Sequence, residues 1–342
     1  MSPPLLITPD IRQTLKETLI VSYGNAQAKA PIWPSRVLGA IDVETTDTVL
    51  VWPEPTIREF DRGPMGDDLT YQTLRWQQRR VTVNPYGVGL KLYNYDLRDL
   101  EKRGLPIVAM YGTQCGKKAG TFNARGAAYM LANGTDATKV TARKGGALFR
   151  HGHPVGGDSS ETFDNYFEEC PFTMQNLAAV RAYARGIDDG SGEPESPEAE
   201  AFVILPENYQ LRVTQLTNAE TLADQISGIA NASSNTYYKG QFGYQEPIVT
   251  SFLSAPTDWY VVIPGWSEGN EAPLNRMELE GWTLTEFTSG NQLSLAQSES
   301  MESHHKARIG FAGGNPRRII KCTSGGSAAN NDARFAAILA NL

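Results

Sequence analysis

A long helix carrying evenly spaced glycines is the feature that most restricts how this chain can fold. Pro106 suits the first turn of a helix and Gly134 suits its stop, so the segment between them predicts a helix of about 28 residues, or about 42 Å. Gly112, Gly116 and Gly120 recur along one stripe, although each interior glycine costs about 1 kcal/mol relative to alanine. The stripe indicates close approach of another backbone; a helix broken near Gly112 is the alternative.

A polar two-stranded excursion is expected over 56–93, ahead of this helix. Turn-forming residues fill 61–68, and apolar residues alternate along the returning chain at 81–92. Such a polar hairpin cannot bury both faces within one subunit, so it is either a solvated flap or a limb that lies on a neighbour. Between the turn and the alternating segment lie Arg75, Trp76, Arg79 and Arg80.

The remaining elements are shorter. A helix is expected from Pro9 through Leu19, followed by a proline-rich arm. A short helix from Asn94 or Asp96 ends near 103, and another covers 173–186, before an acidic loop at 188–200. Strands are expected at 201–205, 247–253, 259–263, 279–287 and 306–322, with a short apolar helix in the tail over 333–342.

Charge and composition exclude several classes of protein. A formal net charge of -7 argues against a chain whose main task is to coat nucleic acid, since such binding depends on Lys and Arg. No apolar run approaches the roughly 20 residues of a membrane-spanning helix, and the first residues do not resemble a signal peptide. Cys115, Cys170 and Cys322 are far apart in sequence, which predicts buried free thiols.

Candidate chemical sites are weak. Gly265–Gly269 matches the GxSxG pattern around Ser267, but Pro273 follows where a hydrolase elbow needs a helix. His151 and His153 have a spacing that can supply two metal ligands, yet no third ligand of defined spacing follows, and a turn packed around His153 is the favoured alternative. The sequence therefore predicts no catalytic residue, no cofactor and no metal.

Three passages, in order along the chain, resemble the major head (capsid) proteins of tailed bacteriophages, in particular the phage Mu-like major head subunit group. The first is Arg58–Phe60 before the hairpin together with Tyr95–Asp99 ahead of the long helix. The second is the Gly146–Val155 turn, with its His-Pro pair. The third is the Phe202–Pro206 strand with the later Trp259–Val262 segment. The proline-rich arm and the tail after 322 depart from the pattern of the group.

The resemblance implies an α+β fold of the Hong Kong 97 type, with an N-terminal arm, an extended β-hairpin loop, a long spine helix, a peripheral domain and an axial domain. The expected divisions are an arm at 1–55, the hairpin loop at 56–93, a peripheral domain at 94–200 with the spine helix at 106–133, an axial domain at 201–278, return strands of the peripheral domain at 279–322 and a tail at 323–342.

The implied function is that of a major capsid protein, which self-assembles into the icosahedral head shell around the viral genome. Its partners would be further copies in hexamers and pentamers, then scaffold, portal and decoration proteins of the same phage, with packaged DNA as a weak inner-surface contact and no membrane. Its place would be the virion, after assembly in the bacterial host cytoplasm. The candidate contacts between subunits are Arg58, Asp61, Arg62, Asp67, Asp68, Arg75, Trp76, Arg79 and Arg80.

Two other classes of function stay open at this stage: a serine hydrolase using Ser267, and a β-rich tail or decoration protein that forms small oligomers. A further hypothesis places the flexible joints of the hairpin at Pro55, Pro85, Gly87 and Gly89.

Overall fold

The computed structural model of the chain describes residues 9–54, 75–93, 104–143, 145–156, 159–188, 194, 200–213, 221–222, 233–234, 246–263, 272–285, 288–289 and 300–341. The expected short helix before 103, the turn at 61–68, most of the loop at 188–200 and the segment around Ser267 lie outside these residues. No helix in the described ranges has the length and apolar character needed to cross a membrane.

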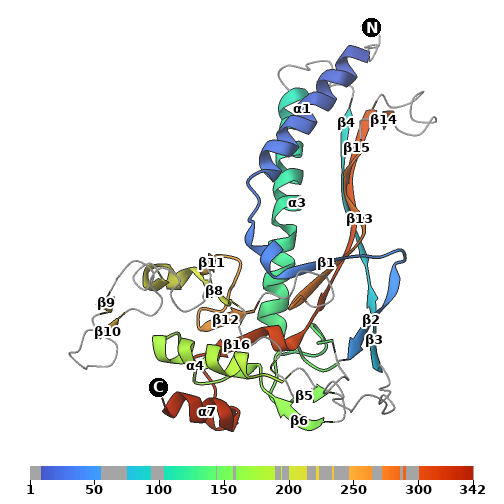
Figure 1. Cartoon of the computed structure of the whole chain (residues 1–342). Coiled ribbons are helices and arrows are strands. Elements are labelled where there is room, and N and C mark those ends of the chain that lie inside the picture. Colours follow the sequence, from blue (N-terminus) through green and yellow to red (C-terminus); the bar gives the residue numbers. More distant parts are fainter. Residues whose placement is uncertain are drawn as a thin grey trace, which may run out of the picture.

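The spine of the molecule is α3 (Leu105–Asn133), a single helix of 29 residues with α1 (Pro9–Gln27) packed along its first half (Figure 1). A Cβ atom added to Gly112 would lie 2.9 Å from the Leu19 carbonyl oxygen, and one added to Gly120 would lie 3.0 Å from the Ala30 Cβ. The glycines therefore let the two backbones meet. The predicted close approach is confirmed, and the alternative of a break near Gly112 is wrong.

A long antiparallel sheet runs beside α3 (Figure 1). Its centre is β15 (Ser300–Gly313), which pairs with β13 (Leu274–Leu284) on one side and β4 (Asn84–Tyr93) on the other. β1 (Leu38–Asp42) joins β13 in parallel, and β14 (Thr288–Ser289) pairs with β15. The arm thus contributes a helix and a strand to the packing of its own chain.

The hairpin differs in extent from the expected one. β2 (Asp47–Glu54) pairs with β3 (Arg75–Thr82), so the hairpin begins earlier than residue 56 and ends at Thr82. Residues 84–93 form β4 of the long sheet instead, paired antiparallel with β15. Gly87 and Gly89 consequently pair with Lys306 and His304 inside a continuous ladder, which is an unsuitable place for the hypothesised joint.

A second sheet lies beyond the C-terminal end of α3, in the order β11 (Ile248–Thr250), β8 (Phe202–Pro206), β12 (Asp258–Val262), β16 (Ile319–Thr323) and β7 (Tyr166–Phe167). Every residue of β8, β12 and β16 is buried, and most of them are apolar, as expected for strands covered on both faces.

Alternate residues of this sheet enter two different cores. Val203 and Leu205 point to a core shared with α4 (Met174–Arg185), whereas Phe202 and Ile204 point to a core shared with the end of α3. The helix α4 is the predicted one, with Thr173 accepting a hydrogen bond from the Asn176 N–H as its N-cap. The sheet thereby unites segments from both sides of the expected divisions at 200 and 278.

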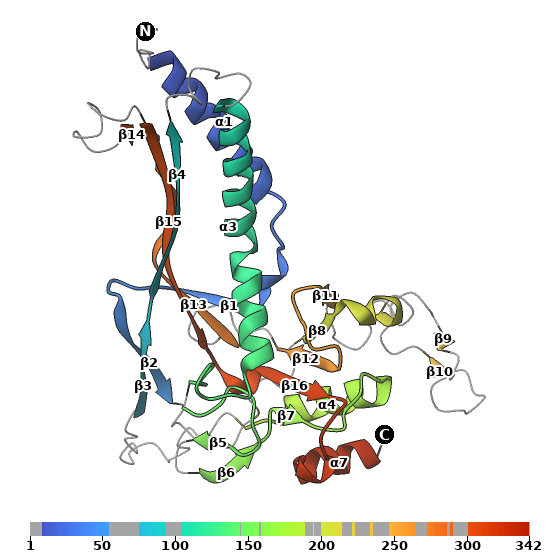
Figure 2. The same cartoon turned by 180° about the vertical axis from the view of Figure 1, so that it is seen from behind.

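The tail is more strongly packed than expected. Its helix α7 (Ala333–Ala340) inserts Phe335, which is only 2% exposed and stacks on Phe167 with ring centroids 4.1 Å apart. Both views place α7 at the far end of the molecule from the start of α1 (Figure 1, Figure 2). The segment after 322 therefore completes a core, because the apolar face of α7 packs against α4 and β7.

Smaller elements connect these layers. They are the short strands β5 (His153–Gly156), β6 (Ser159–Phe163), β9 (Thr221–Leu222) and β10 (Ser233–Ser234), and the 3-10 turns η1 (Trp33–Arg36), η3 (Glu207–Tyr209), η6 (Pro316–Arg318) and η7 (Ala328–Asn330). All three cysteines are buried as free thiols, as predicted.

Candidate assembly surfaces

The root of the β2–β3 hairpin is held by a small apolar core. Leu50 of β2 and Val81 of β3 are 6% and 8% exposed, and they pack with Val83 and with Met277 of β13. Burial of such side chains contributes on the order of 1.5–3 kcal/mol each. One face of the hairpin root is therefore fixed to the long sheet.

Arg79 ties the same root to two other segments. Its guanidinium donates to the carbonyl oxygens of Thr141, Ala142 and Gly313, at 3.5 Å for Ala142 and 3.4 Å for Gly313. Burial lowers the pKa of this guanidinium. These carbonyls belong to the turns after α3 and at the end of β15, so Arg79 binds its own chain and sets the direction in which the hairpin leaves it.

The other face of the hairpin is exposed and partly apolar. Val49 and Val51 alternate with Leu50 along β2 and are 53% and 40% exposed. Arg80 lies nearby on β3, also exposed, with its guanidinium 3.7 Å from the Asp47 carboxylate. Exposed ion pairs of this kind contribute about 0–1 kcal/mol, so this face is free to make other contacts.

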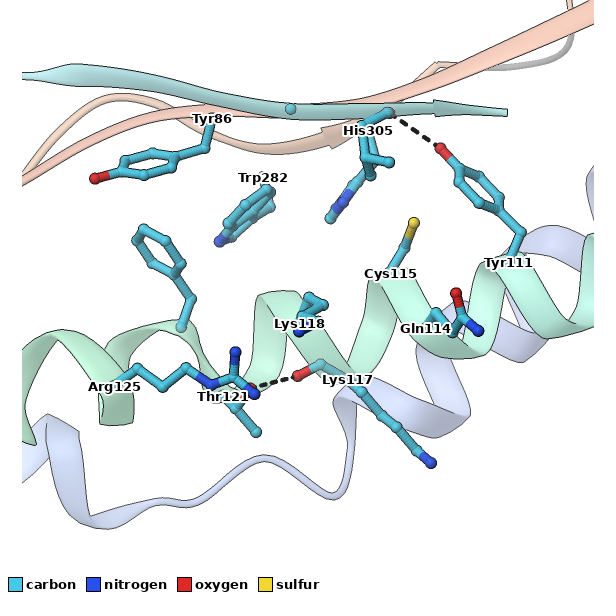
Figure 3. A pocket seen from close by; sticks show the side chains of 13 residues that line it. Tyr86, Tyr111, Gln114, Cys115, Lys117, Lys118, Thr121, Arg125, Trp282 and His305 are labelled. Atoms are coloured by element: carbon cyan, nitrogen blue, oxygen red, sulfur yellow. Dashed lines mark hydrogen bonds between the residues drawn. The ribbon is translucent and has the colours of Figure 1, made fainter. Parts of the chain in front are cut away.

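A groove of about 670 Å³ separates α3 from the long sheet (Figure 3). Its aromatic lining comes from four elements: Tyr86 of β4, Phe122 of α3, Trp282 of β13 and His305 of β15. Phe122 meets Tyr86 and Trp282 edge to face, with ring centroids 4.8 and 5.2 Å away, and Trp282 stacks on His305 at 4.6 Å. The groove thus has a continuous aromatic floor.

Burial favours the neutral forms of three titratable groups in the groove, His305, Tyr111 and Cys115. Burial lowers the pKa of His305 and raises those of Tyr111 and Cys115. The Tyr111 hydroxyl donates to the Val88 carbonyl oxygen at 3.2 Å. Such a lining suits the binding of apolar groups and offers no activated nucleophile.

The candidate metal-binding histidines have structural partners. His153 is buried, stacks on Phe163 at 5.2 Å and donates from Nε2 to the Leu148 carbonyl oxygen at 3.2 Å. His151 Nδ1 lies 2.9 Å from Asp164 Oδ2. Within the described ranges, no three His, Cys, Asp or Glu side chains are grouped as metal ligands would be. The two histidines therefore pack and hydrogen-bond within a turn, which is the alternative favoured from the sequence.

Few of the predicted contact residues can be compared with the structure. Arg58, Asp61, Arg62, Asp67 and Asp68 lie outside the described residues, as does Ser267. The backbones of Arg75 and Trp76 are placed in β3, opposite Glu54 and Pro53. Of this set, the structure gives side-chain partners for Arg79 and Arg80 alone.

Sequence reasoning did not single out the aromatic residues of the groove. They come from strands and a helix up to about two hundred positions apart in the chain, and no spacing rule connects them. The local signal available was the alternation of Tyr86 and Val88 with glycines on β4.

Comparison with known proteins identifies the architecture. No family model and no curated protein matches the chain. Among solved structures it resembles the capsid of the cyanophage P-SCSP1u, with 10% identity over 86% of this chain and 88% of the other, and a TM-score of 0.51. The fold is that of a viral capsid subunit. The expected Hong Kong 97-type fold is confirmed.

Two further structures share the Hong Kong 97-type fold. The capsid of a native GTA particle is 10% identical over 85% of this chain and 89% of the other, with a TM-score of 0.51. The mature capsid of bacteriophage PhiM1 is 9% identical over 85% of this chain and 86% of the other, with a TM-score of 0.50. At such low identity the likeness lies in the fold.

Proposed function

We propose that the chain is a major capsid protein, which self-assembles into an icosahedral head shell enclosing a viral genome. The observation that carries this proposal is the match of most of the chain to capsid subunits from a cyanophage, a GTA particle and bacteriophage PhiM1. The exposed side chains of Val49 and Val51 on the hairpin agree with it, since they are available for contact with an adjacent subunit.

The proposed mechanism is assembly without catalysis. The hairpin would lie on an adjacent subunit, with its root fixed by Arg79 and its exposed face, including Val49 and Val51, in the interface. Many modest interfaces of this kind add together in a closed symmetric shell. The residues proposed for these contacts are Arg58, Asp61, Arg62, Asp67, Asp68, Arg75, Trp76 and Arg80, while Arg79 acts at the root.

The elements of the chain would then belong to a peripheral domain, an axial domain and an arm. We assign α3 and the long sheet to a peripheral domain, and the β11–β8–β12–β16–β7 sheet with α4 and α7 to an axial domain that meets its copies at the centre of a capsomer. α1 and β1 would form the arm, packed on its own subunit.

We further propose membership of the phage Mu-like major head subunit group, on the strength of the passages at 58–60, 146–155 and 202–206. The protein would reside in the virion after assembly in the host cytoplasm. Its partners would be hexamers and pentamers of itself, with scaffold, portal and decoration proteins of the same phage.

Negative-stain microscopy of the purified chain tests the function directly. Megadalton particles of uniform diameter are expected. Small oligomers alone would instead indicate a tail or decoration protein, and an esterase activity lost in Ser267→Ala would indicate a hydrolase.

A deletion tests the role of the hairpin. A variant lacking residues 60–78 should give folded subunits, judged by circular dichroism, that fail to form stable particles. Normal particles from this variant would refute the proposed contact.

A further inference from the structure

The groove between α3 and the long sheet remains open on one side, although its floor is apolar. Tyr86 and Val88 on β4 are 36% and 52% exposed, and both line it. The volume of about 670 Å³ lies within the range of roughly 300–1,000 Å³ that is typical of ligand sites. A well-formed apolar pocket with a few polar groups at its edge is the usual form of a binding site.

The helix side of the groove is positively charged. α3 contains three charged residues, Lys117, Lys118 and Arg125, and all three line the groove. Among the described residues none of the three has an ion-pair partner, and no Asp or Glu lines the groove. On the facing sheet, by contrast, Lys91 and Lys306 lie 3.1 and 3.2 Å from the carboxylates of Glu302 and Glu280.

The spacing of these cations fits a short extended segment. From Lys117 to Arg125 the helix rises about 12 Å at 1.5 Å per residue, which is the length of about four residues of an extended strand at 3.3 Å each. A segment whose carboxylates alternate with apolar side chains would place its charges along α3 and its apolar groups on the aromatic floor. The Lys117 side chain points away from the sheet in Figure 3, so its ammonium group lies at the edge of the groove.

The arrangement of the rings disfavours nucleic acid. Single-stranded nucleic acid binds by stacking bases on open aromatic faces. Here Trp282 is stacked on His305, and Phe122 contacts Tyr86 and Trp282 at interplanar angles of 70° and 83°, so these rings are largely occupied by one another. The floor therefore suits aliphatic or single aromatic side chains better than bases.

We propose that this groove is a docking site for a partner polypeptide with an extended segment in which acidic residues alternate with aliphatic or aromatic ones. Carboxylates of the segment pair with Lys117, Lys118 and Arg125, and its apolar side chains lie on Tyr86, Phe122 and Trp282. The site is built by one chain, so binding does not depend on shell formation.

Fluorescence polarisation with labelled synthetic peptides tests the site on the purified full chain in unassembled form. The peptide Glu-Leu-Glu-Leu-Glu-Leu-Glu should bind. The same peptide with Lys in place of each Glu, or with Ser in place of each Leu, should bind at least about tenfold more weakly, and a labelled oligothymidylate should also be weak.

Matched variants locate the binding. Lys117→Glu and Lys118→Glu should each weaken binding about three- to tenfold, whereas Lys29→Glu, an exposed lysine after α1, should leave it unchanged. Tyr86→Ser should weaken it without any change of charge, while Tyr129→Ser, on an exposed part of α3 outside the groove, should not.

Three results would overturn the proposal. They are equal binding of the acidic and basic peptides, preference for the oligothymidylate, and equal effects of Lys29→Glu and Lys118→Glu. Circular dichroism of each variant separates lost binding from lost folding, and the exposed positions of Lys117, Lys118 and Lys29 keep their variants foldable. Because the peptides are tested on unassembled protein, their failure to bind would leave the proposed capsid function standing.

Discussion

Three glycines of α3 have no side chain at the positions where the backbone of α1 comes close. The tightest contact is at Gly116, where a Cβ atom would lie 2.8 Å from the Ala26 Cβ and closer still to the Tyr23 carbonyl oxygen. The usual cost of about 1 kcal/mol for a helix glycine is therefore offset by a packing that other residues cannot reach.

Gly116→Ala should lower the free energy of unfolding by about 1–3 kcal/mol, since the added methyl group forces the two helices apart. Gly24→Ala, on α1 with no atom near its added Cβ, should instead raise it by about 0.5–1 kcal/mol. Urea unfolding of both variants measures the contrast. Similar changes of the same sign would contradict close packing at Gly116.

His153 makes stability depend on pH. Burial and the charge of Arg150 lower the pKa of this histidine to about 3, whereas an unfolded histidine has a pKa of about 6.5. Between these values the unfolded chain binds a proton that the folded chain excludes. The free energy of unfolding therefore falls as the pH is lowered through this window, by up to about 1.4 kcal/mol per pH unit for this group.

His153→Gln should flatten the pH dependence of the urea midpoint between about pH 6.5 and 4, even though the variant is less stable at neutral pH. His304→Gln, which removes an exposed histidine, serves as the control and should keep the slope. A slope unchanged by His153→Gln would show that other groups account for the acid sensitivity.

At the scale of elements, the sequence predicted those helices and strands that are determined by nearby residues. The helices at 105–133 and 174–185 begin at a proline and at the Thr173 cap, and the strand at 202–206 is an apolar run, so the signals lie within or next to these residues. The partner of a strand is not encoded in this way. The alternation at 88–92 fits any apolar face, so its pairing with β15 in place of a hairpin strand could not be predicted.

The groove and the tail were missed for the same reason. Phe335 becomes a core residue when α7 meets Phe167, and the aromatic floor forms when β4, β13 and β15 meet α3. Each depends on contacts between distant segments. The sequence predicted that one face of the hairpin is not buried by its own subunit. It did not predict that Leu50, Arg79 and Val81 are held at the root.

The hairpin root provides a prediction at this scale. Arg79→Met keeps most of the side-chain length but removes the hydrogen bonds to the carbonyl groups of Ala142 and Gly313. Amide hydrogen exchange of β2 and β3 should then become about tenfold faster or more, as a loss of more than about 1.4 kcal/mol implies.

The neighbouring residue supplies the control. Arg80→Met removes one exposed ion pair with Asp47 and should change the exchange rates little. Equal effects of the two substitutions would show that Arg79 does not anchor the hairpin.

At the scale of the whole molecule, substitutions on the exposed side of the hairpin can distinguish an effect on subunit stability from an effect on assembly. Val49→Asp and Val51→Asp should leave the melting temperature of the subunit nearly unchanged, because both side chains are exposed. The yield of particles on a sucrose gradient should fall strongly, since a buried unpaired charge in an interface costs several kcal/mol. Thr46→Asp, at an exposed site just before the same strand, is a suitable comparison.

Particles formed in normal yield by both valine variants would place the subunit contacts elsewhere. A loss of particles accompanied by a large drop in melting temperature would mean that the side chains act within the subunit.

The pairing of β4 with β15 also means that β4 cannot complete its sheet until much later in translation. Asn84 pairs with Ile309, so β4 must wait for its partner while the intervening chain is translated, which takes about 10–45 s at roughly 5–20 residues per second. During that interval the aromatic residues of β4 are exposed to water without their partner strand. Slower growth at low temperature or a chaperone that shields nascent strands should therefore raise the yield of folded protein.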